Sequence, residues 1–291
     1  MDPTCITNRC KKTQKVGIIG IIGNLFLFII KIVVAVASKS QSLLADAINS
    51  GTDILSSLMT YIGGKISGNK SDKYHNYGYG KAEYVFSLII SLVMGYLAIK
   101  IAINGITSLV KGNVFTFSYS LIIVCIVTII TKFLLYIYTK KIGKEEESIL
   151  ILANAEDHKN DMLVTFTVLI GVVAALFNIY YLDGIVAIGI AVRILYVAIK
   201  FFSESYSVLI DESIDEESMK KIIEIINNNE KVDHIDKITS KAVGKAFVII
   251  TKVSVDGNMT VDESHQVAGV LKAEIMKLKN VYDVIVHVNP V

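Results

Sequence analysis

Long runs of apolar residues dominate the first 210 positions of this 291-residue chain and limit its possible folds more than any other feature. A helix that crosses a bilayer needs about 20 mostly apolar residues. Hydrophobic residues make up 53% of the chain, which is more than the core of a soluble domain of this length needs. The sequence therefore predicts an integral membrane protein with six spanning helices, at residues 16–38, 42–66, 84–108, 118–139, 148–178 and 183–203.

The last part of the chain, residues 211–291, is charged and alternating like a soluble domain. A helical pattern from Glu216 is followed by a short strand near 235–239, a strand over KAFVIITKVSV, a turn at Asp256-Gly257-Asn258, a helix and the strand DVIVHVNP. This αββαβ order predicts a ferredoxin-like or metallochaperone-like α+β domain, with two helices on one face of a three-stranded sheet. We expect a cytoplasmic N-terminal segment (1–15), an all-α transport domain (16–210) and a cytoplasmic dimerisation domain (211–291).

Charge, cysteine content and motifs argue against several classes of protein. The net charge of +2 and the lack of a basic stripe with interleaved aromatics argue against nucleic acid as a partner. The three cysteines form no CxxC pair, so we expect no disulfide framework. The chain contains no HExxH, GxSxG or P-loop motif, so we expect no enzyme activity and no catalytic residues.

The distribution of Lys and Arg residues predicts the orientation in the membrane. Cytoplasmic connections are enriched in these residues, and the other side of the predicted bundle has only Lys39, Lys100 and Lys111. Both termini are therefore expected in the cytoplasm, and without a targeting segment the plasma membrane is the expected location. Eleven basic residues lie on the side of the termini: Arg9, Lys11, Lys12, Lys15, Lys65, Lys70, Lys73, Lys81, Lys140, Lys141 and Lys144.

Two of the predicted spans carry polar residues four positions apart, Asn49 with Asp53 and Asp157 with Asp161. Residues at this spacing share one face of a helix. A carboxylate at membrane depth costs about 2.5–3.5 kcal/mol even on insertion scales, so such residues are expected to face the bundle interior. The two polar faces are therefore expected to meet and form one site.

The sequence does not directly show which group neutralises the charge of these carboxylates. His158 and Lys159 adjoin Asp157 but point about 100° and 200° around the helix from it, so we expect no basic partner in register. A bound metal cation is then the simplest neutraliser, although a proton path or a water-filled crevice would also use such a face. Lys31 and Lys132 lie within spans and are expected to snorkel or pair with neighbours, and we assign no role to Arg193.

Four segments resemble the cation diffusion facilitator family: SLLADAINSGTD in the second span, YHNYGYGKAE before the third, DHKND in the fifth, and VIVHVNP at the end. The resemblance covers nearly the whole chain and both predicted domains. It implies a homodimeric antiporter that exports a divalent metal ion in exchange for protons by alternating access. It also implies that the four transport ligands are Asn49, Asp53, Asp157 and Asp161.

The chemistry of this ligand set suggests which ion is carried. Members that resemble zinc exporters have His at the first and third ligand positions, where this chain has Asn49 and Asp157. An all-oxygen site disfavours zinc relative to the harder Mn²⁺, and the set also resembles the manganese branch. We expect Mn²⁺ to be carried, with export of Fe²⁺ or Zn²⁺, a passive cation channel or a membrane metal sensor as alternatives. No cofactor is expected besides the transported ion.

The resemblance also implies metal sites outside the membrane. In the loop before the third span, Asp72 and His75 match two ligands of the family, but Tyr79 replaces the third. A phenol with a pKa of about 10 is a poor metal ligand. The resemblance further implies a charge pair between Lys81 and Asp211 that links the two domains.

In the soluble domain, Asp236, His265 and His287 match family positions that bind regulatory metals. Two other ligand positions hold Lys252 and Asn289, and a lysine ammonium has no lone pair to donate. We therefore expect at most one metal ion here, bound by Asp236, His265 and His287.

Overall fold

A computed structural model describes residues 3–38, 41–111, 119–175 and 182–291. Its chain divides into two compact units. The first contains Thr7–Gly68 and Glu83–Ser205, and the second contains Met1–Ile6, Asn69–Ala82 and Tyr206–Val291. The second unit thus combines the C-terminal part of the chain with the short loop at 69–82.

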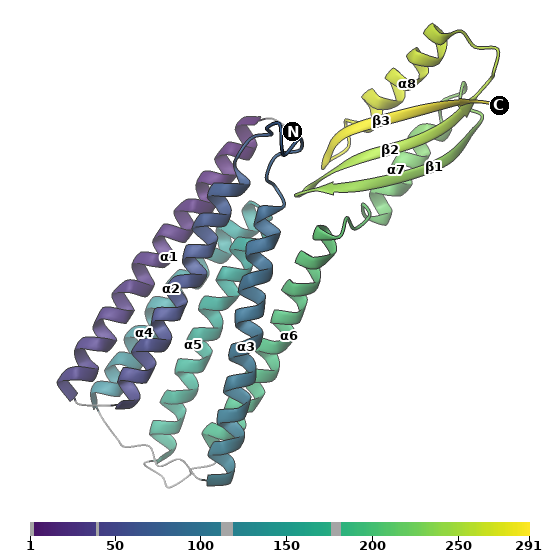
Figure 1. The fold of residues 1–291 in the computed structure, drawn as a ribbon. Coiled ribbons are helices and arrows are strands. Elements are labelled where there is room, and N and C mark those ends of the chain that lie inside the picture. The colour runs from purple at the N-terminus through teal and green to yellow at the C-terminus, as the bar shows by residue number, and fades with distance from the viewer. Residues whose placement is uncertain (1–2, 39–40, 112–118, 176–181) are drawn as a thin grey trace. The chain divides into compact units, whose positions relative to one another are not determined.

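The first unit is a bundle of long helices (Figure 1). By length and composition, three segments of the described residues are apolar enough to cross a membrane: Arg9–Val34, Ala82–Thr107 and Ile122–Glu145. The helices are α1 (Pro3–Ser38), α2 (Gln41–Ser67), α3 (Ala82–Lys111), α4 (Tyr119–Glu145), α5 (Ile149–Ala175) and α6 (Leu182–Leu209).

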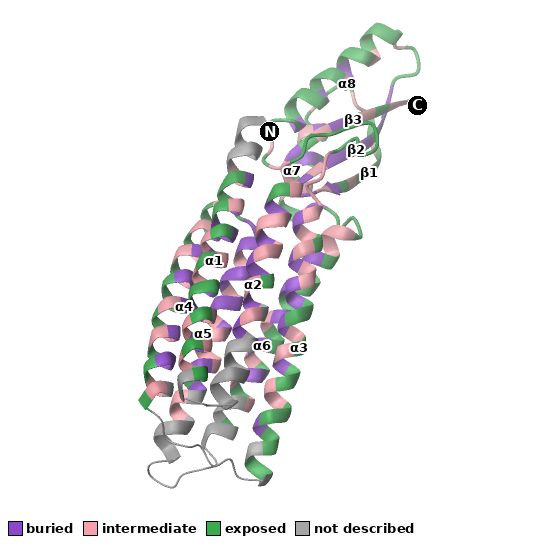
Figure 2. Cartoon of the chain, turned by 60° about the vertical axis from the view of Figure 1, so that its left-hand side comes forward, coloured by how far each residue is buried: buried purple, intermediate pink, exposed green. Residues whose placement is uncertain are grey.

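The distribution of side chains in this bundle is the reverse of that in a soluble protein. Exposed apolar residues of α1 follow one helical stripe, Ile18, Ile22, Leu25, Ile29 and Val33, whereas the buried residues of α2 include Ser50, Asp53, Ser56, Ser57 and Thr60. Figure 2 shows exposed residues along the outer sides of the helices and buried residues between them. An apolar surface around a polar interior is what a bilayer requires, since polar side chains are costly in lipid.

Small residues bring α1 and α2 close together. A Cβ atom added at Gly17 would lie 2.6 Å from the backbone nitrogen of Tyr61, and one added at Gly64 would lie 2.7 Å from the Thr13 side chain. Glycines at such contacts let helix backbones approach closely in a membrane, where packing rather than hydrophobicity favours association.

The helices begin and end differently from the apolar runs. The α1 helix begins at Pro3 and α4 continues to Glu145, so the described part of the segment at 1–15 is helical. Polar ends of these helices are held by ion pairs. Arg9 contacts Glu83 of α3 at 2.9 Å, and Ser148, just before α5, also donates to Glu83.

The α5 helix packs against both α2 and α4, and on another side it shares an apolar core with α3 and α6. That core includes Ile90 and Met94 of α3, Leu150 of α5, and Ile194 and Phe201 of α6. This packing places the polar residues of α5 in the interior of the bundle.

The C-terminal domain has the predicted αββαβ order: α7 (Glu216–Asn227), β1 (His234–Val243), β2 (Ala246–Val255), α8 (Val261–Ile275) and β3 (Val281–Pro290). In the sheet order β1-β2-β3, β2 pairs antiparallel with β1 and parallel with β3. The parallel pair needs a crossover, which α8 provides. The predicted small α+β domain is therefore confirmed.

One apolar core holds the C-terminal domain together. It joins Ile222 and Ile226 of α7, Leu271 of α8, and Ile249 and Val284 of the sheet. Because α7 and α8 contact each other and share this core, they cover the same face of the sheet. A capping box begins α8 at Thr260, which satisfies backbone donors at the helix start.

Leu271→Ala should lower the free energy of unfolding of this domain by about 2–5 kcal/mol, because it removes a side chain that is only 1% exposed and leaves a cavity. The neighbouring Val270 is 53% exposed, so Val270→Ala should change stability by about 0.5 kcal/mol or less. Hydrogen exchange of C-terminal peptides in the purified full-length protein measures both effects. Equal protection of the two variants would contradict this core.

Candidate functional site

A cavity of about 230 Å³ lies in the helical bundle and is lined by residues of α1 to α6. Three of the four predicted ligands, Asp53, Asp157 and Asp161, line it. Asn49 lies in α2, but its side chain is outside the described part of the structure. The remaining lining includes three lysines (Lys31, Lys100, Lys132), the polar residues Ser50, Asn104, Thr128, Asn160 and Thr165, and apolar residues of α3, α5 and α6.

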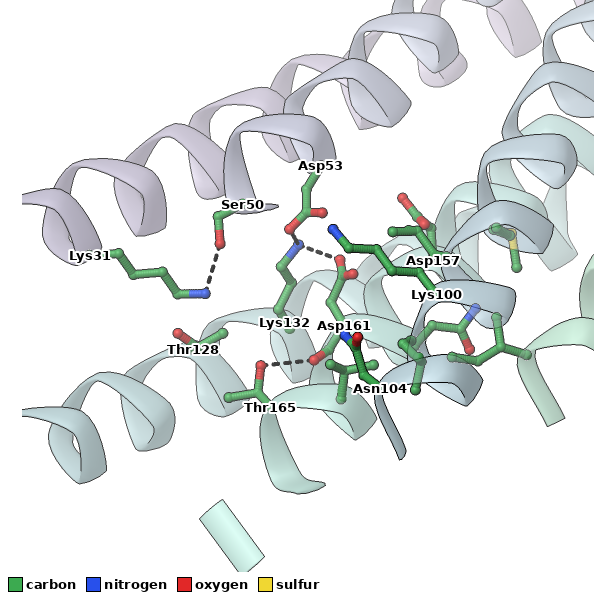
Figure 3. Close-up of a pocket in the computed structure, with 16 residues that line it drawn as sticks. Lys31, Ser50, Asp53, Lys100, Asn104, Thr128, Lys132, Asp157, Asp161 and Thr165 are labelled. Atoms are coloured by element: carbon green, nitrogen blue, oxygen red, sulfur yellow. Dashed lines mark hydrogen bonds and ion pairs between the residues drawn. The ribbon is translucent and has the colours of Figure 1, made fainter. Parts of the chain in front are cut away.

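A lysine of α4 lies between two of these carboxylates (Figure 3). The Nζ atom of Lys132 is 2.8 Å from Oδ2 of Asp53 and 2.5 Å from Oδ2 of Asp161. The side chain of Lys132 is 1% exposed, and those of Asp53 and Asp161 are 7% and 13% exposed. One ammonium therefore joins α2, α4 and α5 in the interior of the bundle.

The expectation that no basic side chain faces the carboxylates is wrong. His158 and Lys159 lie on the same helix as Asp157, whereas Lys132 comes from a different helix. Helical periodicity defines the face on which a residue lies but not the residues of the neighbouring helix. The signal in the sequence was Lys132 itself, because a lysine within an apolar span usually has a partner or a function.

Further hydrogen bonds position the acidic residues of the site. Asn24 of α1 donates to the backbone carbonyl of Asp53 at 3.0 Å and to the Ser57 hydroxyl at 3.1 Å. The Ser56 hydroxyl hydrogen-bonds to the Asp157 carboxylate, which links α2 to α5. These contacts hold the site on rigid helices rather than on loops.

The other two lysines that line the cavity have different surroundings. Lys31 is 3% exposed and donates to the Ser50 hydroxyl at 2.7 Å, whereas Lys100 is exposed. Of the two expected outcomes for Lys31 and Lys132, snorkelling or pairing, the structure shows pairing for both: Lys31 with Ser50, and Lys132 with Asp53 and Asp161.

Arg193, to which the sequence assigned no role, connects α6 to α5. Its guanidinium donates to Glu156 and to the side-chain oxygen of Asn160, both at 2.9 Å. Glu156 directly precedes Asp157, so this pair positions the part of α5 that carries the acidic residues. Both side chains of this ion pair are partly exposed, Arg193 to 33% and Glu156 to 19%.

The side chains of the cavity that could bind a metal ion offer oxygen atoms as ligands. Among the described residues that line it, no side chain is a histidine or a cysteine. His158 is fully buried but does not line the cavity. It lies towards α1, where a Cβ atom added at Gly20 would be 3.6 Å from its Nε2 atom. Three carboxylates without imidazole or thiolate suit a hard divalent cation better than a soft one.

In the loop at 69–82, the polar groups satisfy one another. The Asp72 carboxylate accepts from the Tyr79 hydroxyl at 2.8 Å and from the backbone amides of Tyr74 and His75 at 2.8 and 2.7 Å. These hydrogen bonds lower the pKa of Asp72 to about 2. His75 and Tyr79 stack with ring centroids 4.2 Å apart. Asp72 thus serves as the acceptor that fixes the turn.

The same loop contacts the C-terminal domain within the second unit. The Nζ atom of Lys81 lies 2.6 Å from Oδ1 of Asp211, the two residues expected to form a charge pair. The ring of Tyr77 contacts Tyr282 of β3 edge to face. At the β1–β2 turn, Gly244 has φ +64°, and a Cβ atom there would lie 3.0 Å from the backbone of Gly80.

The proposed ligands of the C-terminal domain are not gathered at one point in the single chain. Asp236 of β1 accepts from Ser254 and Asn289 and lies 3.1 Å from the His234 ring. His265 on α8 and His287 on β3 are exposed. No group of three or more His, Cys, Asp or Glu side chains is arranged for a metal ion among the described residues.

Two family models match nearly the whole chain: the cation efflux transmembrane domain at residues 17–210, and the cytoplasmic domain of cation efflux proteins at residues 214–291. The chain is 29% identical to the manganese efflux system protein MneP of Bacillus subtilis, over 96% of each chain. It is 30% identical to an uncharacterised transporter of Methanocaldococcus jannaschii, over 96% of this chain and 99% of that one. It is also 30% identical to the magnetosome protein MamB of a Magnetospira strain, over 89% of each.

Tyr79→Phe should raise the pKa of Asp72 from about 2 towards its ordinary value of 3.8, because the Tyr79 hydroxyl donates to the ionised carboxylate and favours that form. A depressed pKa means that the turn is stabilised above pH 3.8 and loses this contribution as the pH falls towards 2. An NMR titration of labelled Asp in the purified protein measures the change, with Tyr74→Phe as the control. An unchanged Asp72 pKa would contradict the assigned hydrogen bond.

Proposed function

This chain belongs to the cation efflux family, the cation diffusion facilitators, and we propose that the ion it exports is Mn²⁺. Members of the family are membrane transporters and not enzymes. The observation that supports the proposal is that Asp53, Asp157 and Asp161 line one interior cavity. In this structure Lys132 lies between two of these carboxylates, and among the described residues no three such side chains are arranged around a metal position. Carboxylate oxygens prefer Mn²⁺ over softer ions, and the relative MneP is named as a manganese efflux protein.

The proposed transport site consists of these three carboxylates and Asn49, the fourth residue of the predicted set. In a state open to the cytoplasm, the ionised carboxylates take up the metal ion. Rocking of the helices then opens the site to the other side. Protons arriving there compete with the ion for the carboxylate oxygens, because a ligand oxygen must be deprotonated to bind metal. Export is therefore coupled to the entry of protons.

In the proposed topology, all six helices α1–α6 span the plasma membrane and both termini lie in the cytoplasm. The inside-out distribution of side chains supports spanning by α2 and α5, whose polar faces lower their hydropathy. The bias of Lys and Arg supports the orientation. The C-terminal domain matches the cytoplasmic domain of the family, and we propose that it forms a homodimer.

The sites outside the membrane are proposed as secondary. Occupancy of the loop by metal would require Asp72 and His75 to give up the hydrogen bonds of the turn. Metal binding by Asp236, His265 and His287 would require these residues to approach one another when two chains associate. The Lys81–Asp211 pair supports a role in linking the loop to the C-terminal domain, and it needs no metal.

In a bacterium that lacks its own manganese exporter, expression of this chain should lower the cellular Mn²⁺ content and restore growth at toxic Mn²⁺ concentrations. Asp53→Ala and Asp161→Ala should abolish both effects, because each removes a ligand. Glu230→Ala removes an exposed carboxylate of the C-terminal domain and serves as the matched control. If the Asp53→Ala variant, at equal expression, protected the cells from Mn²⁺ as well as wild type does, the assigned transport site would be wrong.

Asp157→His should shift the preference from Mn²⁺ towards Zn²⁺ by about tenfold or more, because imidazole suits zinc and makes the site less hard. The measurement is the ratio of Zn²⁺ to Mn²⁺ exported by cells that express the variant, compared with wild type. If the ratio stays the same while transport continues, position 157 does not contribute a ligand.

A further inference from the structure

We propose that Lys132 is a built-in counter-cation of the transport site, which occupies Asp53 and Asp161 when no metal is bound and must be displaced for an ion to bind. This inference deepens the proposed function and rests on it. It assigns to Lys132 the control of metal affinity and release. Lys132 would then be a positioning residue of the transport cycle rather than a ligand.

The contacts of Lys132 occupy the same oxygen atoms that a metal ion would need. Its ammonium lies 2.8 Å from one carboxylate and 2.5 Å from the other, and the two carboxylates belong to different helices. A metal ion would need the lone pairs of these same oxygens, and an ammonium has none to share with it. Two cations at this distance also repel each other in the interior. Metal binding is therefore an exchange of one cation for another.

The charges around the cavity show why the carboxylates need a cation. Among the described residues that line it are three carboxylates and two buried ammonium groups, those of Lys31 and Lys132, whereas Lys100 is exposed. Of these lysines, Lys132 is the one that forms ion pairs with the carboxylates, at Asp53 and Asp161. Buried carboxylates without a partner would be strongly destabilising. Lys132 thus makes the metal-free site a stable state, and it lowers the affinity for metal by the same interaction.

The surroundings of Lys132 offer the ammonium a second position. Thr128 lies one turn before Lys132 on the same face of α4 and lines the same cavity. Its hydroxyl is buried and has no hydrogen-bond partner among the described residues. Long side chains of a helix generally lean towards its N-terminal end, so in the proposed exchange the ammonium moves to Thr128 when metal takes the carboxylates. The exchange changes the position of the lysine and not its charge.

Equilibrium binding of Mn²⁺ to the purified full-length protein, measured by titration calorimetry, tests the proposal. Lys132→Met should bind Mn²⁺ about tenfold more tightly or better, because the competing cation is gone. Thr128→Val should bind it more weakly, because the displaced ammonium loses its acceptor. Lys140→Met removes a charge from the same helix outside the cavity, where Lys140 donates to Tyr136, and should bind like wild type.

Transport kinetics add a readout that a purely structural role would not move. In proteoliposomes, Lys132→Met should show a lower KM and also a lower maximal rate, because tighter binding slows release. Lys132→Arg keeps the charge and offers two parallel donors to the carboxylates, so it should bind Mn²⁺ more weakly than wild type. This second variant keeps the test decisive if Lys132→Met does not fold.

The outcomes separate this inference from the proposed function. If Lys132→Met binds Mn²⁺ no more tightly than wild type while Asp53→Ala loses binding, the counter-cation role is overturned and the transport site stands. If Lys132→Arg binds as tightly as wild type, the role is likewise overturned. If Asp53→Ala binds Mn²⁺ like wild type, both the site and the inference fall.

Discussion

The ion pair of Lys132 with Asp53 and Asp161 is the contact on which the arrangement of the helices depends. Charges in an apolar surrounding persist only when they are paired, and removing one partner of a buried pair costs about 3–5 kcal/mol. The three partners come from α4, α2 and α5, so the pairing requires these helices to meet. Arg193 extends the same principle to α6 through Glu156. The polar faces of α2 and α5 are thereby buried, and the apolar faces of the other helices are left for lipid.

The chemistry outside the bundle serves structure in the single chain. Asp72 fixes a turn, Asp236 is held by Ser254 and Asn289, and Lys81 pairs with Asp211. Each of these groups already has the partners that a metal ion would replace. In the interior cavity, two of the three carboxylates, Asp53 and Asp161, share one ammonium group, that of Lys132. The proposed exchange of cations therefore belongs to the bundle, and the C-terminal domain matches the cytoplasmic domain of the family.

The small α+β domain and the shared helix face of each i, i+4 polar pair could be predicted from the sequence, because both depend on local periodicity. Asp157 and Asp161 on one helix must share a face, and three of the four predicted ligands line one cavity. The partnership of Lys132 could not be predicted, since it depends on which helices are neighbours. The helix α1 begins at Pro3, well before the apolar run at 16–38. The difference arises because hydropathy indicates the length in lipid and not the helix ends. Arg193 was given no role because its partner Glu156 lies on a different helix.

The most direct test of the central claim is Mn²⁺ uptake into proteoliposomes of the purified protein under an imposed pH gradient, with the internal pH recorded at the same time. The account predicts that an acidic interior accelerates Mn²⁺ entry, that protons leave as Mn²⁺ enters, and that Zn²⁺ moves more slowly. Uptake that ignores the gradient and moves no protons would instead indicate a passive channel. Faster movement of Zn²⁺ than of Mn²⁺ would contradict the selectivity inferred from the three carboxylates.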